Sequence, residues 1–184
     1  MIYPIVVYGS PVLREQTQEI TADYPNLKQL VEDMFATMYN AEGIGLAAPQ
    51  IGLSIRMFVI DLNILAEDDP QFKGFKKVFI NPQITEYGED MDSCDEGCLS
   101  IPGVSESVKR PTKIRIQYMD EDMTPHDEVF EGYKARVVQH EYDHLEGKVF
   151  IDRISPIRRQ MNKGKLTSMI NGKIRCRYRI KTAK

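Results

Sequence analysis

Hydrophobic residues recur with a helical period in the segment that follows Asn26. They occupy positions i, i+3, i+4, i+7, i+8 and i+11, as Leu27, Leu30, Val31, Met34, Phe35 and Met38. Because a helix repeats about every 3.6 residues, these side chains share one face. The pattern predicts a helix over 26–40 that packs one face into the core. A stripe of Met and aromatic residues at this spacing is typical of core packing, so we assign it no chemistry.

Shorter segments have the alternating or apolar character of β-strands. Strands are predicted at 56–61, 78–84, 113–119, 128–131 and along the tail, where Ile174, Cys176, Tyr178 and Ile180 alternate with cationic residues. Residues 61–77 are expected to form a surface loop. Ser155-Pro156 begins a second, basic helix that is expected to reach about Ile170 and to end at Asn171-Gly172. Strands around one long buried helix indicate an α+β fold.

The composition is that of an ordinary globular chain. The 184 residues are 42% hydrophobic and 28% charged, which is typical of one domain spanning 1–184 and excludes disorder and a coiled coil. No run approaches about 18 apolar residues, and the start Met1-Ile2-Tyr3-Pro4 is unlike a signal or transit peptide. Three cysteines argue against a disulfide framework. We therefore expect a cytoplasmic protein with neither DNA nor a membrane as a partner.

Candidate chemistry is concentrated in the segment H-E-Y-D-H at 140–144. On a helix, the two histidines and Glu141 share one face. The H-E-x-x-H pattern is typical of zinc hydrolases, in which the histidines bind the ion and the glutamate acts on a water molecule. The alternative is a solvated or ion-paired helix face. That alternative is the weaker one because two of the chain's three histidines lie at ligand spacing and Tyr133, Val137 and Val138 continue a helical face.

A catalytic metal site needs a third protein ligand and one open position. In zinc peptidases with the longer pattern H-E-x-x-H-x-x-G-x-x-H, that ligand is the last histidine, but this chain has Phe150 there. The later acids, Glu146 and Asp152, lie too close to the helix end to reach the same ion. The remaining candidates are upstream: Cys94, Cys98 and His126.

Three ordered motifs resemble those of the peptide deformylase family. They are Gly43-Ile44-Gly45-Leu46-Ala47-Ala48-Pro49-Gln50, Glu96-Gly97-Cys98-Leu99-Ser100 and His140-Glu141-Tyr142-Asp143-His144. The N-terminal Pro4-Ile5-Val6 and Tyr8-Gly9-Ser10-Pro11-Val12-Leu13-Arg14 are also similar, so the likeness covers about residues 4–156. The resemblance implies mixed or antiparallel β-sheets around a central α-helix that bears one divalent metal ion, with Cys98, His140 and His144 as its ligands.

Two other interpretations stay open. A closed Cys2His2 structural zinc site would add Cys94 to the three ligands just named, at acceptable spacings, but it gives no reason for Glu141 or for the loop at 43–50. A metallopeptidase would explain Glu141, but it lacks its downstream ligand at Phe150.

The resemblance implies a metal-dependent hydrolase that removes the formyl group from the N-terminal formylmethionine of newly made polypeptides and releases formate. A water molecule activated by the ion would attack the formyl carbon, with Glu141 as general base and then general acid. The Gln50 side-chain amide and the Leu99 backbone N–H would stabilise the oxyanion. Gly45, with Gly43, would let the backbone approach the substrate closely.

The methionine side chain of such a substrate requires an apolar pocket beside the ion. Tyr133, Arg136 and Val137 precede His140 by seven, four and three residues and so lie on its helical face; the resemblance adds Ile44. Arg136 departs from an apolar wall, and we expect its stem to line the pocket while its charge reaches solvent. All four residues are equally consistent with plain core packing.

The identity of the metal depends on more than the ligand set. Cys-His-His suits zinc, which binds more tightly than ferrous iron in a given N/S site by the Irving-Williams order. The resemblance, however, implies ferrous iron. We expect Fe²⁺ in the cell; the purified protein could instead hold Zn²⁺, Ni²⁺ or Co²⁺, whichever ion was available.

The net charge of −3 conceals an asymmetry. Residues 158–184, which form the predicted basic helix and tail strand, hold ten of the 24 Lys and Arg and none of the 27 Asp and Glu. Such a segment attracts polyanions, and an enzyme of nascent chains would use it to contact the ribosome. The alternative is a solvated strand face, because the cations of the tail alternate with apolar residues.

Overall fold

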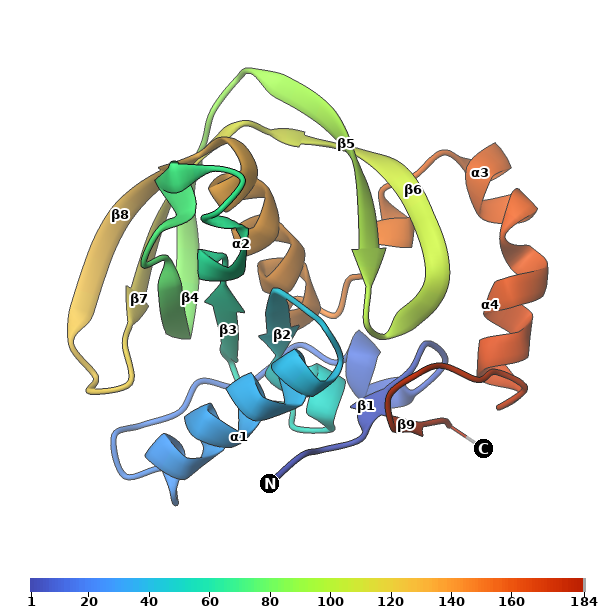
Figure 1. The fold of residues 1–184 in the computed structure, drawn as a ribbon, viewed down its shortest axis with the longest axis horizontal. Helices are drawn as coiled ribbons and strands as arrows, with labels where there is room; N and C mark the ends of the chain where they lie inside the picture. Colours follow the sequence, from blue (N-terminus) through green and yellow to red (C-terminus); the bar gives the residue numbers. More distant parts are fainter. Residues whose placement is uncertain (184) are drawn as a thin grey trace.

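The computed structural model describes residues 1–183; Lys184, one of the cations counted in the C-terminal segment, lies outside the described residues. Figure 1 shows the strands and helices, which in chain order are β1 (Ile5–Val6), α1 (Leu27–Asn40), β2 (Gly45–Ala47), β3 (Met57–Asp61), β4 (Lys76–Tyr87), β5 (Met91–Cys98), β6 (Ile101–Pro111), β7 (Lys113–Met119), β8 (Pro125–Glu131), α2 (Gly132–Leu145), α3 (Pro156–Met161), α4 (Lys163–Ile170) and β9 (Ile180–Lys181). Within residues 1–183, no helix combines the length and apolar character needed to cross a bilayer.

The main sheet has five antiparallel strands in the order β2-β3-β4-β7-β8. A long hairpin, β5-β6, forms a second antiparallel pair, and β1 pairs in parallel with β9. Figure 1 shows α2 between the main sheet and this hairpin, and α2 contacts β2, β3, β7 and β8 as well as β6. The predicted α+β fold with a central helix is confirmed.

The helix predicted over 26–40 is confirmed as α1. All six apolar residues of its stripe are buried, and they share a hydrophobic cluster with residues of β2, β3 and β4. Asn26 precedes the helix at φ 54° without a side-chain cap. Burial of the apolar face, rather than capping, therefore stabilises this helix.

Helix α2 has sharply defined ends. Gly132, at φ +60°, turns the chain from β8 into the helix, a conformation that favours glycine. At the other end, the N–H of Lys148 donates to the Asp143 carbonyl at 2.9 Å, and the N–H of Gly147 donates to the His144 carbonyl at 3.3 Å. With Gly147 at φ +67°, this is a Schellman cap. The glycine that follows the H-E-x-x-H motif is therefore a helix terminator in this chain.

The strands differ from the prediction mainly in one hairpin. Strands β3, β4, β7 and β8 confirm four predicted strands, and the predicted loop at 61–77 contains short 3-10 turns. The hydrophobic pattern does not indicate the β5-β6 hairpin. Alternate residues of β6 are buried, but two of them are Glu106 and Arg110, which form ion pairs. Buried charge pairs remove the apolar alternation on which strand prediction depends.

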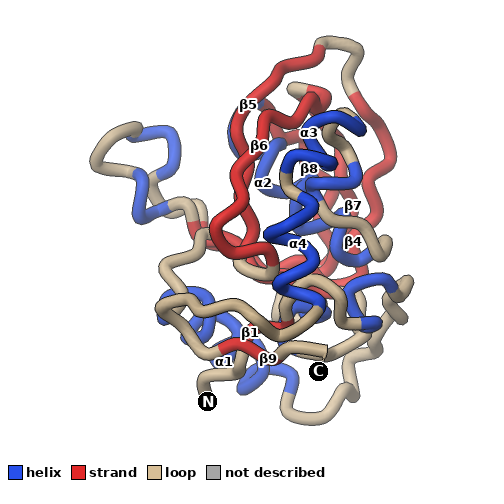
Figure 2. Tube along the Cα trace, turned by 90° about the vertical axis from the view of Figure 1, so that its right-hand side faces the viewer, coloured by secondary structure: helices blue, strands red, loops and turns tan. Residues whose placement is uncertain are grey.

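The C-terminal segment corrects two predictions (Figure 2). The predicted basic helix is two helices, α3 and α4, separated at Asn162, whose side-chain amide donates to Glu106 at 2.6 Å. The predicted tail strand is wrong over most of its length. Residues 173–179 do alternate between exposed and half-buried positions, but among the described residues of the tail only Ile180–Lys181 forms a strand, paired with β1. The alternation therefore reflects packing against the body of the protein rather than strand pairing.

Candidate metal centre

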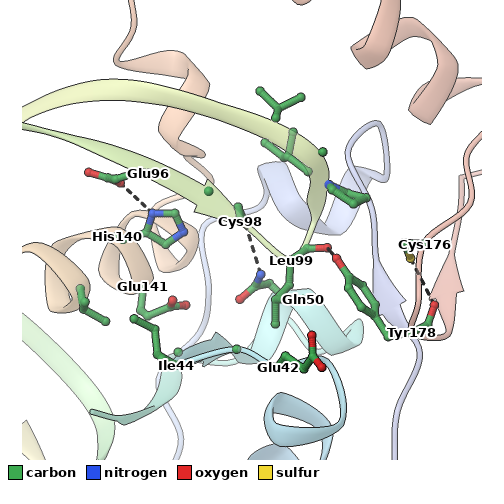
Figure 3. A pocket seen from close by; sticks show the side chains of 18 of the residues that line it. Glu42, Ile44, Gln50, Glu96, Cys98, Leu99, His140, Glu141, Cys176 and Tyr178 are labelled. Carbon is green, nitrogen blue, oxygen red and sulfur yellow. Dashed lines mark hydrogen bonds and ion pairs between the residues drawn. The ribbon is translucent and has the colours of Figure 1, made fainter. Parts of the chain in front are cut away.

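Helix α2 and the end of β5 bring the three predicted ligands together; Cys98 and His140 are labelled in Figure 3. Sγ of Cys98 lies 3.4 Å from Nε2 of His144. One ligand atom from each of Cys98, His140 and His144 lies within 4.8 Å of the others. The two imidazole centroids are 5.5 Å apart, as expected for side chains one turn apart on a helix. These three residues form a single group that could hold a metal ion, which we call the ligand cluster.

The donors of the ligand cluster suit a tetrahedral ion. A tetrahedral zinc with Zn–S of about 2.3 Å and Zn–N of about 2.0 Å separates neighbouring ligand atoms by about 3.5 Å. The distance between Cys98 and His144, 3.4 Å, is close to that value. Although burial opposes ionisation, the charges and hydrogen bonds of the two imidazoles lower the pKa of the Cys98 thiol to about 5. The thiolate is the form that binds metals, so the residues present fit a single N/S-bound ion.

Glu96 holds the first histidine of the cluster. Its Oε1 lies 2.8 Å from Nδ1 of His140, which leaves Nε2 of that ring free to bind an ion. The same carboxylate accepts two hydrogen bonds from Arg110, at 2.7 and 2.9 Å, and one from Arg136, at 2.7 Å. Although burial opposes ionisation, Arg110 and His140 lower the pKa of Glu96 to about 2. The sequence pattern alone does not reveal this role; its one signal is that Glu96 stands two residues before Cys98.

A second buried carboxylate, Asp143, ties α2 to the same network. Arg110 donates to it at 2.9 Å, and Arg153 donates two hydrogen bonds of 2.6 Å. The side chain of Arg110 is only 1% exposed, whereas that of Arg153 is 39% exposed, so the centre of the network is closed to solvent and Arg153 forms its outer edge. Removing one partner of such a pair typically costs about 3–5 kcal/mol, because the other charge is left buried and unpaired. Asp143 occupies a position that the H-E-x-x-H pattern leaves open, so the motif does not predict it.

Glu141 lies beside the ligand cluster, against Gly45. Its side chain is buried, and Oε2 has no hydrogen-bond partner among residues 1–183. Burial raises the pKa of Glu141 to about 7. A β-carbon on Gly45 would lie 2.4 Å from Oε1 of Glu141, so the position requires glycine. An unpaired acceptor with a pKa near neutrality is suited to exchange protons with a reactant.

Gln50 directs its amide N–H groups toward the cluster. Its Oε1 accepts a hydrogen bond from the Ala47 N–H at 2.8 Å, which assigns the other side of the amide as NH₂. Nε2 lies 3.5 Å from Sγ of Cys98 (Figure 3) and 3.1 Å from Oγ of Ser100. Leu99 occupies the turn between β5 and β6, directly after the cysteine. Both predicted oxyanion donors therefore come from residues at the cluster.

Two members of the ligand cluster, Cys98 and His140, line a pocket of about 710 Å³ together with Glu141. The five predicted substrate residues line the same pocket: Gly43, Ile44, Tyr133, Arg136 and Val137. Ile44 and Val137 supply apolar surface. The ring of Tyr133 packs edge-on against Phe72, with centroids 5.9 Å apart, and the residue is 39% exposed. The structure thus brings the predicted substrate residues together with the ligands.

The prediction that the charge of Arg136 reaches solvent is wrong. The residue is 7% exposed. Its guanidinium donates to Glu96, to the Val108 carbonyl at 2.9 Å and to the Asp92 carbonyl at 2.9 Å. The β5-β6 hairpin supplies all three acceptors, so the charge is held inside the protein by hydrogen bonds and by a buried carboxylate.

The other ligand candidates lie away from the cluster. Within residues 1–183, the metal-binding group does not include Cys94. His126 is bonded to Asp120 at 2.8 Å. Phe150, at the position of the last histidine in the longer peptidase pattern, is stacked on His140 with ring centroids 6.0 Å apart. The group found in the structure is therefore the Cys-His-His set.

Comparison with known sequences agrees with this geometry. Residues 2–160 match the family described as polypeptide deformylase. The peptide deformylase of Cytophaga hutchinsonii is 49% identical over 181 residues, which cover 98% of this chain and 97% of that protein. The peptide deformylase of Flavobacterium johnsoniae is 50% identical over 191 residues, which cover 100% and 97%.

Solved structures give the same result. The crystal structure of peptide deformylase from Thermotoga maritima matches with a TM-score of 0.77 at 41% identity, covering 85% of this chain and 99% of that chain. The crystal structure of a peptide deformylase from Legionella pneumophila matches with a TM-score of 0.82 at 36% identity, covering 96% and 99%. With motifs, site geometry, sequence and fold in agreement, the chain belongs to the polypeptide deformylase family.

Proposed function

We propose that this protein hydrolyses the N-formyl group of formylmethionyl polypeptides, releasing formate and a free N-terminus, and that residues 1–184 act as one catalytic domain. The observation that carries the proposal is the position of Glu141, a buried carboxylate with an unpaired oxygen, beside the ligand cluster and in a pocket large enough for the start of a peptide. Membership of the deformylase family supports it.

Cys98, His140 and His144 would hold one divalent metal ion. When bound, the ion supplies Lewis acidity to the formyl oxygen and lowers the pKa of a water molecule. Glu96 keeps the His140 ring in the orientation that presents Nε2. We expect Fe²⁺ in the cell, and Zn²⁺, Ni²⁺ or Co²⁺ in the purified protein, because these ions bind N/S sites more tightly than ferrous iron.

Glu141 is the residue that moves the proton. Its carboxylate takes a proton from the attacking water and later delivers it to the departing amine, so one group serves as base and then as acid. A pKa raised by burial to about 7 favours both transfers near neutral pH. Gly45 is essential to this arrangement because any side chain there would collide with the carboxylate.

Gln50 and Leu99 stabilise the negative charge that develops on the formyl oxygen. The amide of Gln50 is already oriented by the hydrogen bond from Ala47, so its N–H groups need no reorganisation during the reaction. Leu99 contributes its backbone N–H from the turn beside Cys98. Removing one donor of this kind typically lowers the rate by about 10²–10³-fold.

The methionine side chain would occupy the pocket beside His140. Ile44 and Val137 provide apolar walls, and the stem of Arg136 lines the pocket while Glu96 neutralises its charge. A neutralised guanidinium leaves the pocket suitable for an apolar side chain. The proposed substrate-binding residues are Gly43, Ile44, Tyr133, Arg136 and Val137.

One assay tests the proposal and separates it from two alternatives. Wild type and Glu141→Gln, both purified anaerobically, are incubated with formyl-Met-Ala-Ser, and formate is followed. We expect formate from the wild type and a loss of about 10²–10⁴-fold in the variant, with unchanged metal content. A metallopeptidase would cleave an internal peptide bond, and a structural zinc domain would release no formate. Metal-loaded wild type that yields no formate would contradict the proposal.

The basic segment 158–184 is the proposed contact with the ribosome, in the cytoplasm where formylated chains are made. Exposed cations on α3, α4 and the tail would attract ribosomal RNA. The competing interpretation is a solvated face that binds no RNA. It is supported by Arg158, whose charge already pairs with Glu106 at 2.7 Å. In the double variant Lys163→Glu, Lys173→Glu, co-sedimentation with ribosomes should decrease. Unchanged co-sedimentation would favour the solvated face.

A further inference from the structure

The C-terminal tail forms one wall of the pocket that Cys98, His140 and Glu141 line. Five consecutive tail residues line this pocket: Ile174, Arg175, Cys176, Arg177 and Tyr178. In Figure 3, Cys176 and Tyr178 lie on the far side of Leu99 from His140 and Glu141. A peptide whose formyl group lies at Glu141 would therefore extend past Leu99 toward the tail.

Hydrogen bonds hold the tail in this position. The hydroxyl of Tyr178 donates to the Leu99 carbonyl at 2.7 Å, next to the cysteine of the cluster. Farther along, the N–H of Ile5 donates to the Arg179 carbonyl at 2.9 Å, where β9 begins to pair with β1. Because hydrogen bonds fix the tail at Tyr178 and at Arg179, directly after it, the tail is a wall of the pocket rather than a free extension.

The tail presents its arginines to solvent along the edge of the pocket. Cys176 and Tyr178 are half-buried, whereas Arg175 and Arg177 are exposed. The side chain of Arg177 is 89% exposed and pairs at 3.3 Å with Glu42, which is 70% exposed and lines the same pocket. Among residues 1–183, no ion pair of 4.0 Å or less involves Arg175.

These two cations are available to a ligand. An ion pair between exposed side chains contributes little and exchanges readily with other partners, so Glu42 competes with a ligand for Arg177 but does not exclude it. Farther inside the pocket, Arg136 is neutralised by Glu96 at 2.7 Å. The cationic side chains of the pocket lining that remain available to a ligand therefore lie on the tail. The carboxylates of the pocket lining belong to other segments.

We propose that Arg175 and Arg177 form a subsite for an acidic side chain of the substrate, two or three residues after the formylmethionine. This inference rests on the proposed deformylase function. An extended peptide advances about 3.3 Å per residue and alternates its side chains, so one of these two positions would face the tail. Because the arginines are exposed, the preference for an acidic over a neutral side chain should be about 2- to 5-fold in kcat/KM, and salt should weaken it.

The test measures kcat/KM for formyl-Met-Ala-Xaa-Ala-amide and formyl-Met-Ala-Ala-Xaa-amide, where Xaa is Asp, Asn or Lys. The amide removes the terminal carboxylate, which would otherwise compete for the arginines. Wild type should rank Asp above Asn above Lys in at least one series, with smaller differences at about 0.5 M salt. In Arg175→Glu, Arg177→Glu the order should reverse. In Glu42→Gln, which frees Arg177, the Asp preference should increase.

A matched control lies in the same tail. Arg179→Glu makes one such Arg-to-Glu change outside the pocket lining and should leave the wild-type order in place. Equal rates for the Asp, Asn and Lys peptides in both series of the wild type would overturn the subsite. An unchanged order in the double variant, with its fold confirmed by circular dichroism, would also overturn it. An unchanged order together with lost ribosome co-sedimentation would overturn it and assign the arginines to RNA.

Failure of the proposed function would give a different result, because then no peptide of either series would release formate. Where the double variant does not fold, the response of Glu42→Gln decides: an Asp preference no larger than that of the wild type would overturn the subsite, since the freed Arg177 would then have no effect on the substrate.

Discussion

Oε1 of Glu96 lies 2.8 Å from Nδ1 of His140, and this contact joins the ligand cluster to the ion network between the β5-β6 hairpin and helix α2. Arg110, from β6, bonds both Glu96 of β5 and Asp143 of α2. The relative placement of Cys98 and the histidines therefore depends on a buried guanidinium that no ligand motif contains.

Loss of the Glu96 charge should weaken metal binding. In Glu96→Gln the hydrogen bond to His140 is weaker and Arg110 loses one of its two ionic partners, so we expect metal affinity to fall by about 10–100-fold. Competition with a chelator measures it. The control is Glu86→Gln. Glu86 lies on β4 and is an exposed ionic partner of Arg115, so this variant should bind metal normally. Equal affinities for both variants would contradict a role for Glu96 in holding the ligand.

A methyl group on Gly45 should displace Glu141 without removing the metal. The β-carbon would lie 2.4 Å from Oε1 and 2.8 Å from Cδ of Glu141, so the carboxylate must move. Misplacement of a reacting group by about 1 Å can lower the rate by about 10²-fold, and we expect a decrease of this size in kcat for Gly45→Ala. Formate release and metal analysis measure the two effects.

The control for Gly45→Ala is another glycine-to-alanine change. Gly164 lies in α4, and an added β-carbon there would have no neighbour within 4 Å. Gly164→Ala should keep full activity and raise the free energy of unfolding by up to about 1 kcal/mol, because alanine is the better helix former. If Gly45→Ala were as active as Gly164→Ala, Glu141 would not need its observed position.

Gln50→Leu tests the amide donor with little change of volume. The variant keeps the shape of the side chain but removes the N–H groups directed at Cys98 and Ser100. We expect kcat to fall by about 10²–10³-fold, with metal content and KM little changed, because the donor acts mainly on the charge that develops during the reaction. A variant with altered KM and unaltered kcat would assign Gln50 to substrate binding instead.

Local sequence patterns were sufficient for part of this structure. The period of α1 lies within one helix, and the two histidines lie one turn apart on another, so short-range spacing determines both. Cys98 is distant in sequence from the histidines and could be assigned only through resemblance to known motifs. The α+β class also follows from local patterns, since strands and helices each have their own periodicity.

Features that depend on contacts between distant segments could not be predicted. Glu96, Arg110 and Arg136 are charged residues that a pattern assigns to the surface, yet the structure buries them together. The same pairing conceals the β5-β6 hairpin, because its inward positions carry charge. In the tail, the pattern predicts a strand that is mostly absent. The alternation of exposed and half-buried residues is real, but it arises from contact with Leu99 and β1 rather than from pairing in a sheet along the whole tail.

Cys98 and Cys94 should differ in their effect on metal content. In Cys98→Ser the ion loses its thiolate, and we expect the purified protein to hold little metal and to release no formate. Cys94→Ser is the matched control, because the sulfur of Cys94 lies outside the metal-binding group of residues 1–183; it should keep both metal and activity. Loss of metal in both variants would support the Cys2His2 alternative.

Arg136→Met tests whether this arginine acts mainly as a structural ion partner. Its guanidinium faces Glu96 and two backbone carbonyls rather than solvent. Its removal leaves buried acceptors unpaired and should lower the free energy of unfolding by about 1–3 kcal/mol. Glu96 keeps Arg110, and the apolar stem is replaced by one of similar shape, so KM for formyl-Met-Ala-Ser should change little. Urea unfolding and steady-state kinetics give the two quantities.

Arg115→Met is the control for Arg136→Met. Arg115 forms an exposed pair with Asp127, so its replacement should cost less than about 1 kcal/mol. Equal losses in the two variants would contradict a structural role for the charge of Arg136. A large rise in KM for Arg136→Met alone would assign that charge to the substrate, since only a group that contacts the substrate alters its binding without a matching loss of stability.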